Sequence, residues 1–285
     1  MGLKFLSFLF LITFLSLAQG QPVTVSYPRP ADNVRWSYQI DLLKLALEHS
    51  EAEYRLVESE LVMTQSRMVA EIRSDRLSVG WMGTSRELEK NMIPIRIPLM
   101  RGLLGYRICI IHADNQPLFS AIRRLDDWRK ISIGQGLGWA DVGILKDAGF
   151  DVYEATYQSL FPMLENGRFD CFLRGINEAN AEVAEWKGAN PNLTVEDNLL
   201  LVYPFAMFFF VSKNNPLLAD QIEKGLEAAY ADGSFMQYFN NHPSIRRILE
   251  DTHVASRRRF DIDNSSLSEE TRLIPSVYWH DIEKP

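Results

Sequence analysis

Short β-rich runs alternate with helical runs along most of the chain, and this alternation constrains the fold more than any other feature of the sequence. The first series has strands expected at Val23–Tyr27, Tyr54–Val57 and Leu77–Met82, and helices expected at Trp36–His49 and Gln65–Arg73. In the first helix, Leu43, Ala46 and Leu47 recur at the helical period. A βαβα order of this kind predicts a mostly parallel sheet with helices on both faces.

The same alternation begins again after Gly105. Strands are expected at Tyr106–Ile111, Ile131–Gly134, Val152–Glu154 and Phe169–Leu173, and helices at Asp141–Ala148, Leu160–Glu165 and Asn177–Trp186. Although no repeat is visible at the level of single residues, the same order of elements occurs twice. The chain is therefore expected to form an α/β fold with two lobes.

The last third of the chain has a different pattern. Leu199–Val211 is strand-like, and its Pro204 is placed as at a bend or a sheet edge. Asn215 is expected to cap a long helix over Pro216–Tyr230, because Pro216 would occupy the first helical position. A further helix is expected at Phe235–Leu249, and the polar end from Asp261 to Pro285 is expected to be an irregular tail.

The N-terminus has the three parts of a secretory leader. Lys4 supplies a positive charge, Phe5–Ala18 is an apolar run of about 14 residues, and small residues follow at Ala18 and Gly20. The alternative, a membrane anchor, would need roughly 20 apolar residues to span a bilayer. We therefore expect residues 1–20 to be a cleaved signal peptide. No cysteine lies near the cleavage point, so a lipoprotein is not expected.

The charge of the chain argues against binding to nucleic acid. It has 30 basic and 37 acidic residues, a formal net charge of −7, whereas nucleic-acid binders present a basic face. The one dense basic run, Arg257-Arg258-Arg259, is interpreted as a local solvated cluster.

The two cysteines, Cys109 and Cys171, each lie inside an apolar run. Buried free thiols are the favoured interpretation, although an exported chain could oxidise the pair. The cysteines and the five histidines lack the spacing of a metal site, and no cofactor is expected.

Several stretches carry a resemblance to a known family. Trp81-Met82-Gly83-Thr84-Ser85-Arg86-Glu87 looks like a strand followed by a Thr-x-x-Arg-Glu turn, Pro98–Ile111 like a crossover between lobes, and Val211–Leu217 and Tyr230–Phe235 like a closing section. Together they resemble family 3 of the bacterial extracellular solute-binding proteins, the amino-acid-type periplasmic binders, over roughly Val23 to Phe239.

The resemblance implies a two-lobed type II periplasmic-binding-protein fold, in which each lobe is a mostly parallel sheet flanked by helices. Two hinge strands would join lobe one, residues 21–104 plus 205–285, to lobe two, residues 105–204. A small-molecule ligand would lie in the cleft and be trapped by hinge closure.

In lobe one, Arg86 is the first candidate for ligand binding, because the family's arginine at this point grips the ligand carboxylate. A guanidinium holds such a group through two parallel hydrogen bonds. The turn is one residue shorter than in the family, and the alternative is a surface arginine. Thr84 and Trp81 are companions, although Trp81 would also fit the core. Tyr27 is a candidate for an aromatic wall.

In lobe two, a glycine-rich loop precedes a helix and resembles the family's ligand loop. Gly136, Gly138 and Trp139 are candidates, because exposed amides at a helix N-terminus attract anionic groups. A simple turn between strand and helix is the alternative.

The stretch Phe172–Glu178 departs from the family, because Arg174 stands roughly where amino-acid binders have an aspartate for the ligand ammonium. A cation there would attract an anion; the alternative is a surface salt bridge to Glu178. Glu178 is also a candidate for the acidic role, and Asn177 for a ligand contact or a helix cap. Arg96 and Arg107 flank the crossover and are not ranked.

These residues predict a periplasmic protein, a monomer, that captures a small anionic or zwitterionic solute for an ABC-type permease. The alternative is a sensor read by a membrane receptor. An enzyme such as a dehydratase is disfavoured, because no histidine lies in a segment expected at the cleft mouth.

Overall fold

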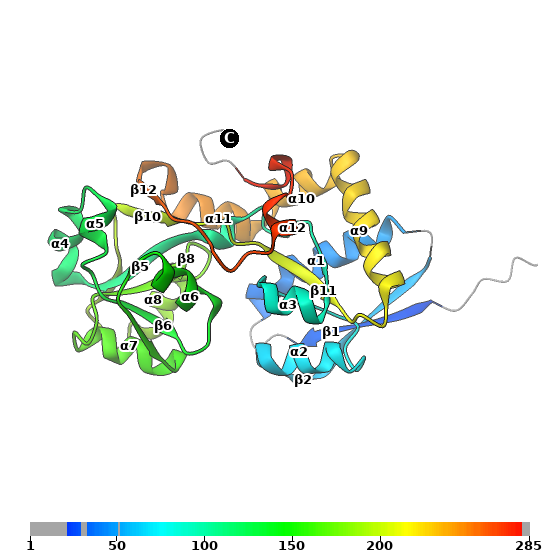
Figure 1. Ribbon diagram of the computed structural model, residues 1–285, viewed down its shortest axis with the longest axis horizontal. Helices are drawn as coiled ribbons and strands as arrows, with labels where there is room; N and C mark the ends of the chain where they lie inside the picture. The colour runs from blue at the N-terminus through cyan, green and yellow to red at the C-terminus, as the bar shows by residue number, and fades with distance from the viewer. Residues whose placement is uncertain (1–21, 30–32, 51, 281–285) are drawn as a thin grey trace, which may run out of the picture.

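The computed structural model describes residues 22–29, 33–50 and 52–280. Two α/β lobes lie side by side along the long axis of the molecule, with helix α11 (Pro243–Asp251) between them (Figure 1). The expected leader lies outside the described residues. None of the helices within them is long and apolar enough to cross a membrane.

Lobe one contains the first βα series and the helices that follow the second crossover. Strands β1 (Val23–Arg29) and β2 (Tyr54–Val62) pair in parallel, and β3 (Val79–Gly83) and β4 (Ile93–Ile95) pair on either side of β11 (Met207–Val211). The helices of this lobe are α1 (Asn33–Glu48), α2 (Gln65–Arg73), α3 (Arg86–Asn91), α9 (Pro216–Ala231) and α10 (Ser234–Asn241). Asn215 caps α9 as expected, accepting a hydrogen bond from the Leu218 amide.

Lobe two is built around one sheet in the order β12-β10-β5-β8-β6-β7, with β9 added on β5. Its strands are β5 (Tyr106–His112), β6 (Ile133–Gly136), β7 (Val152–Ala155), β8 (Cys171–Gly175), β9 (Leu193–Val195), β10 (Leu199–Val202) and β12 (Arg258–Asp261). Its helices are α4 (Gln116–Ser120), α5 (Leu125–Trp128), α6 (Ala140–Asp147), α7 (Tyr157–Glu165) and α8 (Ala179–Trp186). The strands of the βα units pair in parallel, whereas β5, which enters the lobe, is antiparallel to its neighbours.

Two crossovers join the lobes. One leads from β4 to β5 through a short turn at Leu103–Gly105, and the other leads from β10 to β11 through Pro204. The crossovers touch at Gly105, where an added Cβ would lie 1.9 Å from the Tyr203 carbonyl oxygen. This close approach requires glycine.

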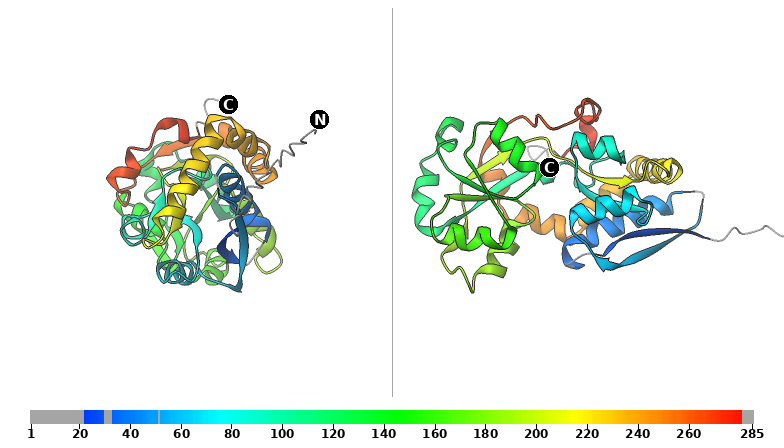
Figure 2. Two further views of the ribbon diagram at one scale, coloured as in Figure 1. Left: turned by 90° about the vertical axis from the view of Figure 1, so that its right-hand side faces the viewer. Right: turned by 60° about the horizontal axis from the view of Figure 1, so that its bottom comes forward.

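The C-terminal segment, residues 242–280, departs from the expectation of one helix and an irregular tail. The expected helix over Phe235–Leu249 is divided into α10 and α11, because Pro243 lacks an amide hydrogen and begins a new helix. After α11 the chain forms β12 in the sheet of lobe two, and then returns to lobe one at α12 (Glu269–Arg272) (Figures 1 and 2). The segment thus adds two connections between the lobes.

This path amends two sequence-based interpretations. We keep the division of the lobes at about 104 and 205 as a proposal, with β12 added to lobe two because it pairs with β10. Arg257 is not part of a solvated cluster. It is 3.5 Å from the buried Glu196 carboxylate and donates to the Leu199 carbonyl oxygen at 3.1 Å.

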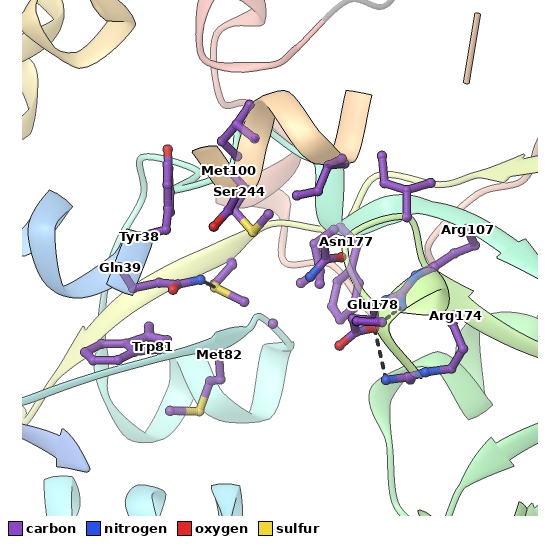
Figure 3. A pocket seen from close by; sticks show the side chains of 18 of the residues that line it. Tyr38, Gln39, Trp81, Met82, Met100, Arg107, Arg174, Asn177, Glu178 and Ser244 are labelled. Carbon is purple, nitrogen blue, oxygen red and sulfur yellow. Dashed lines mark hydrogen bonds and ion pairs between the residues drawn. The ribbon is translucent and has the colours of Figure 1, made fainter. Parts of the chain in front are cut away.

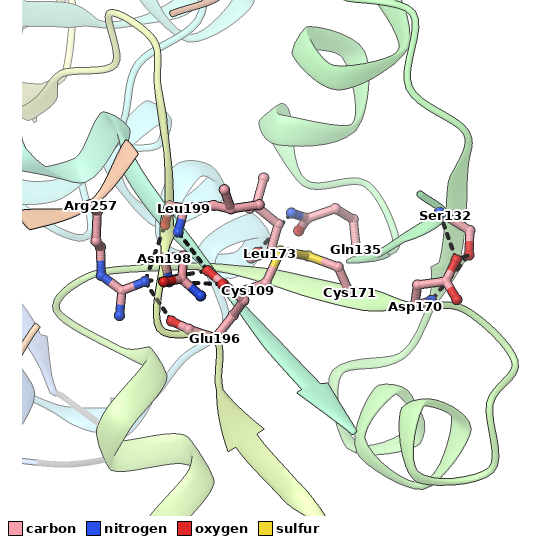
Figure 4. Close-up of a disulfide and its surroundings, with 10 residues drawn as sticks. All are labelled: Cys109, Ser132, Gln135, Asp170, Cys171, Leu173, Glu196, Asn198, Leu199 and Arg257. Atoms are coloured by element: carbon pink, nitrogen blue, oxygen red, sulfur yellow. Dashed lines mark hydrogen bonds and ion pairs between the residues drawn. A yellow bond between two sulfur atoms is a disulfide. The ribbon is translucent and has the colours of Figure 1, made fainter. Parts of the chain in front are cut away.

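Cys109 and Cys171 form a disulfide, so the expectation of free thiols is wrong (Figure 4). Cys109 on β5 pairs with Leu173 on the neighbouring β8, two residues from Cys171. The two cysteines therefore lie diagonally on one face of the sheet, with their Cα atoms 5.3 Å apart. The sequence could not predict this, because it does not reveal that the two strands are neighbours.

Candidate ligand site between the lobes

A cavity of about 420 Å³ lies between the lobes (Figure 3). It has a largely apolar wall from lobe one, a charged wall from lobe two, and a third wall from α11. The residues that line it are Tyr38, Gln39, Gln65, Trp81, Met82, Gly83, Met100, Leu104, Arg107, Trp139, Ala140, Asp141, Arg174, Ile176, Asn177, Glu178, Asn180, Ala181, Phe205, Met207, Ser244, Ile245, Arg247, Ile248 and Thr252.

The lobe-one wall is built by α1 and β3. Trp81 on β3 packs edge-on against Phe209 of the neighbouring β11 and stacks with Tyr27, the ring centroids being 6.1 and 6.4 Å away. The Tyr38 hydroxyl on α1 donates to the Leu99 carbonyl oxygen at 2.7 Å. These contacts fix two aromatic rings at the cavity, and Tyr27 supports Trp81 from behind.

Gln39 on α1 is the polar residue of this wall, and sequence reasoning missed it. Only 5% of Gln39 is exposed, and its Nε2 is 3.4 Å from the Met207 sulfur. Its Oε1 is buried without a hydrogen-bond partner among the residues that the structure describes. The side chain extends toward the cavity from the α1 side in Figure 3.

The lobe-two wall centres on Arg174, at the end of β8. Its guanidinium donates to the two carboxylate oxygens of Glu182 at 2.7 Å each, and lies 3.1 Å from Glu178. It also lies over the Trp139 ring, 4.6 Å from the centroid. Burial opposes the charge of Arg174, but Glu178 and Glu182 outweigh it and hold the pKa of the guanidinium above its usual range.

Arg174 therefore lines the cavity, but it is not a free cation. The alternative salt bridge to Glu178 is present, but its Arg174 side is buried instead of lying at the surface. The second partner, Glu182, lies eight residues further along the chain on α8, and sequence reasoning did not name it.

A second arginine, Arg107 on β5, extends this charged wall. Its guanidinium is 2.7 Å from Asp141 on α6 and 3.8 Å from Glu178, and the Tyr203 hydroxyl donates to the same Asp141 oxygen. Burial opposes the charge of Arg107, but the neighbouring Asp141 raises its pKa overall. The position of Arg107 beside the expected crossover could have indicated that it lies at the cavity, but it did not identify Asp141 as its partner.

Asn177 lies in the turn between β8 and α8. Its side chain does not cap the helix, which starts after Glu178 without a side-chain capping bond. Instead Asn177 lines the cavity, and its Oδ1 is buried with no hydrogen-bond partner within the described part of the chain. Asn177 thus faces the cavity from the wall opposite Gln39 (Figure 3).

Helix α11 supplies the third wall through Ser244, Ile245, Arg247 and Ile248, and Thr252 at its C-cap completes this wall. Ile245 and Ile248 are buried in the core, which anchors the helix. The sequence pattern predicted helix here, but nothing in it indicated that this helix lies between the lobes.

Several predicted ligand residues lie elsewhere. Arg86 is exposed, does not line the cavity, and donates from Nε to the Leu267 carbonyl oxygen of the C-terminal segment at 2.9 Å. Thr84 is fully buried and donates to Glu89 at 2.6 Å. Arg86 therefore holds the chain's own C-terminal segment, and Thr84 holds α3.

Two glycines of the lobe-two loop act indirectly. An added Cβ at Gly136 would lie 2.1 Å from the Trp139 ring, so Gly136 allows Trp139 to pack at the cavity wall. Gly138 has a φ of +76°, the left-handed region that favours glycine. Neither glycine lines the cavity.

No family model and no curated protein sequence matches the chain. Solved structures do match it. An ancestral arginine-binding protein bound to glutamine has a TM-score of 0.56 and 18% sequence identity, covering 79% of this chain and all of that chain.

Two other matches have related descriptions. An ancestral amino-acid-binding protein, a precursor of cyclohexadienyl dehydratase, has a TM-score of 0.52 at 15% identity, covering 76% of this chain and 94% of its own. A histidine kinase sensor domain with similarity to periplasmic binding proteins has a TM-score of 0.53 at 14% identity, covering 77% of this chain and 95% of its own. These likenesses establish that the chain has the periplasmic-binding-protein fold, as the sequence predicts.

Proposed function

We propose that this protein captures a small polar solute in the cavity between its lobes and releases it chemically unchanged. The observation that carries the proposal is that Gln39 and Asn177, on opposite lobes, line the same cavity, and that each has a buried side-chain oxygen without a described hydrogen-bond partner. Leaving a buried polar atom unpaired costs about 1–3 kcal/mol. A solute that donates hydrogen bonds to both oxygens removes this cost and favours the arrangement in which the lobes face each other.

The charged wall refines the class of solute. The expectation of an anion rested on Arg174, and that guanidinium is already matched by Glu182 and Glu178. The open acceptors at the cavity require a solute with N–H or O–H donors. A zwitterion, such as an amino acid, supplies them, and a simple anion does not. Neighbours in structure that are described as bound to arginine or glutamine support this class.

The place of action that we propose is the periplasm. The leader-like N-terminus and the disulfide support export, because disulfides persist in oxidising compartments. We propose an ABC-type permease as the membrane partner, as for a neighbour described as the substrate-binding protein of an amino acid ABC transporter.

A sensor is the second candidate, favoured by the likeness to the histidine kinase sensor domain. Both functions use the same capture step and differ in which membrane protein responds to the loaded form. A gene next to permease and ATPase genes would support transport, whereas one next to a kinase gene would support sensing.

An enzyme on this scaffold is not proposed, despite the likeness to a dehydratase precursor. General acid–base catalysis needs a positioned titratable group at the substrate. No histidine of the described residues lines the cavity, and Glu178 and Asp141 there are ion-paired to arginines.

The experiment is a thermal-shift screen of the mature protein with the standard amino acids, dicarboxylates, phosphates and polyamines. A true ligand at about 100 times its dissociation constant adds roughly 2.7 kcal/mol of stability. We expect amino acids to raise Tm. Gln39→Leu should weaken the hit at least about tenfold, and Lys44→Gln on the exposed face of α1 should not. A screen in which no compound raises Tm contradicts the proposal.

A further inference from the structure

The arginines at the cavity differ in whether their charge is already matched. Among the residues that the structure describes, Arg107, Arg174 and Arg247 line it. Arg107 is paired with Asp141 at 2.7 Å, and Arg174 is paired with Glu182 at 2.7 Å. Arg247 on α11 has no carboxylate partner among the residues that the structure describes.

The described residues of the lobe-two wall carry no excess positive charge. Arg107 and Arg174 face three carboxylates, those of Asp141, Glu178 and Glu182. On the other lobe, the oxygen of Gln39 adds a further acceptor. This surface would repel an anionic group in the cavity. Binding of such a group therefore needs a positive charge from another element.

Helix α11 holds Arg247 at the cavity, where its positive charge would offset that of a bound anionic group. Ile245 is 1% exposed and Ile248 is 7% exposed, so the helix is anchored in the core. Ser244, Arg247 and Ile248 follow the i, i+3, i+4 spacing of one helix face, and all three line the cavity. Arg247 also lines a hollow on the outer surface, so it stands at the rim, where it reaches both the cavity and solvent.

The arginine that the sequence favoured is engaged elsewhere. Arg86 donates to the Leu267 carbonyl oxygen and lies outside the cavity lining. Of the described arginines that line the cavity, Arg247 is therefore the unmatched cation for a ligand carboxylate.

We propose that α11 is part of the ligand site, and that Arg247 binds the carboxylate of the solute while Gln39, Asn177 and Glu178 accept hydrogen bonds from its donor groups. The proposal rests on the proposed function. It assigns the anion-binding role to a helix of the C-terminal segment, in place of the turn after β3.

The test compares each amino acid with its decarboxylated counterpart. The probes are L-arginine with agmatine, and L-glutamine with 4-aminobutanamide, titrated by calorimetry into the full mature chain. Arg247→Gln removes the cation, and Arg246→Gln is the matched control. Arg246 is the neighbouring exposed arginine on the same helix, 3.6 Å from Glu250.

The expected result is selective. Arg247→Gln should weaken binding of the amino acid about tenfold or more, the size of a lost charge-assisted hydrogen bond, and should leave the amine unchanged within about twofold. Arg246→Gln should leave both unchanged. Unchanged Tm of the unliganded variants checks that the fold is intact.

The failures can be told apart. If Arg247→Gln binds the amino acid as the wild type does, or loses amino acid and amine equally, the role of Arg247 is wrong and solute capture stands. If neither amino acid binds the wild-type protein, the proposed solute class fails and the role of Arg247 fails with it.

Discussion

The two turns that the sequence marked for ligand binding, one after β8 and one after β3, have the same order of elements but different surroundings. Each carries an arginine near the end of a core strand. Arg174 near the end of β8 is buried, and two carboxylates from the turn and from α8 hold it at the cavity. Arg86 after β3 begins α3, is exposed, and donates to a backbone carbonyl of the C-terminal segment. An arginine's role is thus decided by the partners that the rest of the chain already supplies.

The two turns are also anchored by different means. The disulfide joins β8 to β5, three residues before Arg174. At the other turn, Glu89 on α3 accepts hydrogen bonds from Ser268 at 2.6 Å and Thr271 at 2.8 Å. One turn is fixed within its own lobe, whereas the other depends on residues nearly 180 positions away.

The largest effect is expected from the covalent anchor of β8. Replacing both cysteines, as Cys109→Ala with Cys171→Ala, should lower the free energy of unfolding by about 4 kcal/mol, since the cross-link closes a loop of some 62 residues. Urea denaturation at pH 7 measures this. The single variant Cys109→Ala should lose a similar amount. Equal stability of the wild type and the double variant would show that the bridge does not anchor this lobe.

The next effect is expected from the ion pair at the cavity. Glu182→Gln should cost about 3 kcal/mol of unfolding free energy, because removing one partner leaves the buried Arg174 charge poorly matched. Glu185→Gln, an exposed position on the same helix, should change stability by less than about 0.5 kcal/mol.

The double variant Arg174→Met with Glu182→Leu tests the same pair by removing both charges together. Replacing both charges by apolar groups should recover much of the loss, because no unmatched charge remains. If Glu182→Gln is as stable as the wild type, the pair does not hold Arg174 in place.

How much of this structure the sequence could predict depends on how far apart in the sequence the contacting residues lie. The βα series and the cap at Asn215 depend on local patterns, and the structure has both. Of the predicted ligand residues, Arg174 near the end of β8, Trp81 within β3 and Trp139 directly before α6 line the cavity.

The rest could not be predicted, because it depends on which distant segments meet. Nothing local shows that Cys109 and Cys171 share a face, or that α11 lies between the lobes. Gln39 appears as one more polar residue of an amphipathic helix. Arg86 matched a familiar motif, but its partner Leu267 lies in a segment that the pattern left irregular.

The stability of the turn after β3 is expected to depend on pH through Glu89. Burial raises the pKa of Glu89, but hydrogen bonds from Ser268, Thr84, Thr271 and Arg96 outweigh it, so the pKa lies below its usual value. A lowered pKa in the folded state adds stability above the unfolded value of about 4.3, and this stability is lost as pH falls through the folded pKa.

Glu89→Gln should therefore cost about 2 kcal/mol at pH 7, the size of charge-assisted hydrogen bonds. The difference from the wild type should shrink below about pH 4, as urea denaturation at several pH values would measure. A difference that stays constant from pH 7 to pH 3 would mean that the carboxylate charge does not hold the C-terminal segment.

The smallest effect is expected at Arg86, and it separates the two turns most directly. Arg86→Ala removes one side-chain hydrogen bond to a carbonyl oxygen at a solvent-exposed position, so it should cost only about 1 kcal/mol of unfolding free energy. Because Arg86 does not line the cavity, affinity for L-arginine or L-glutamine should stay within about twofold of the wild type, whereas Arg247→Gln should lose about tenfold or more. Calorimetry on both variants decides between them. A tenfold loss with Arg86→Ala and none with Arg247→Gln would return the anion-binding role to the turn after β3, and would mean that its contact with Leu267 opens when the solute enters.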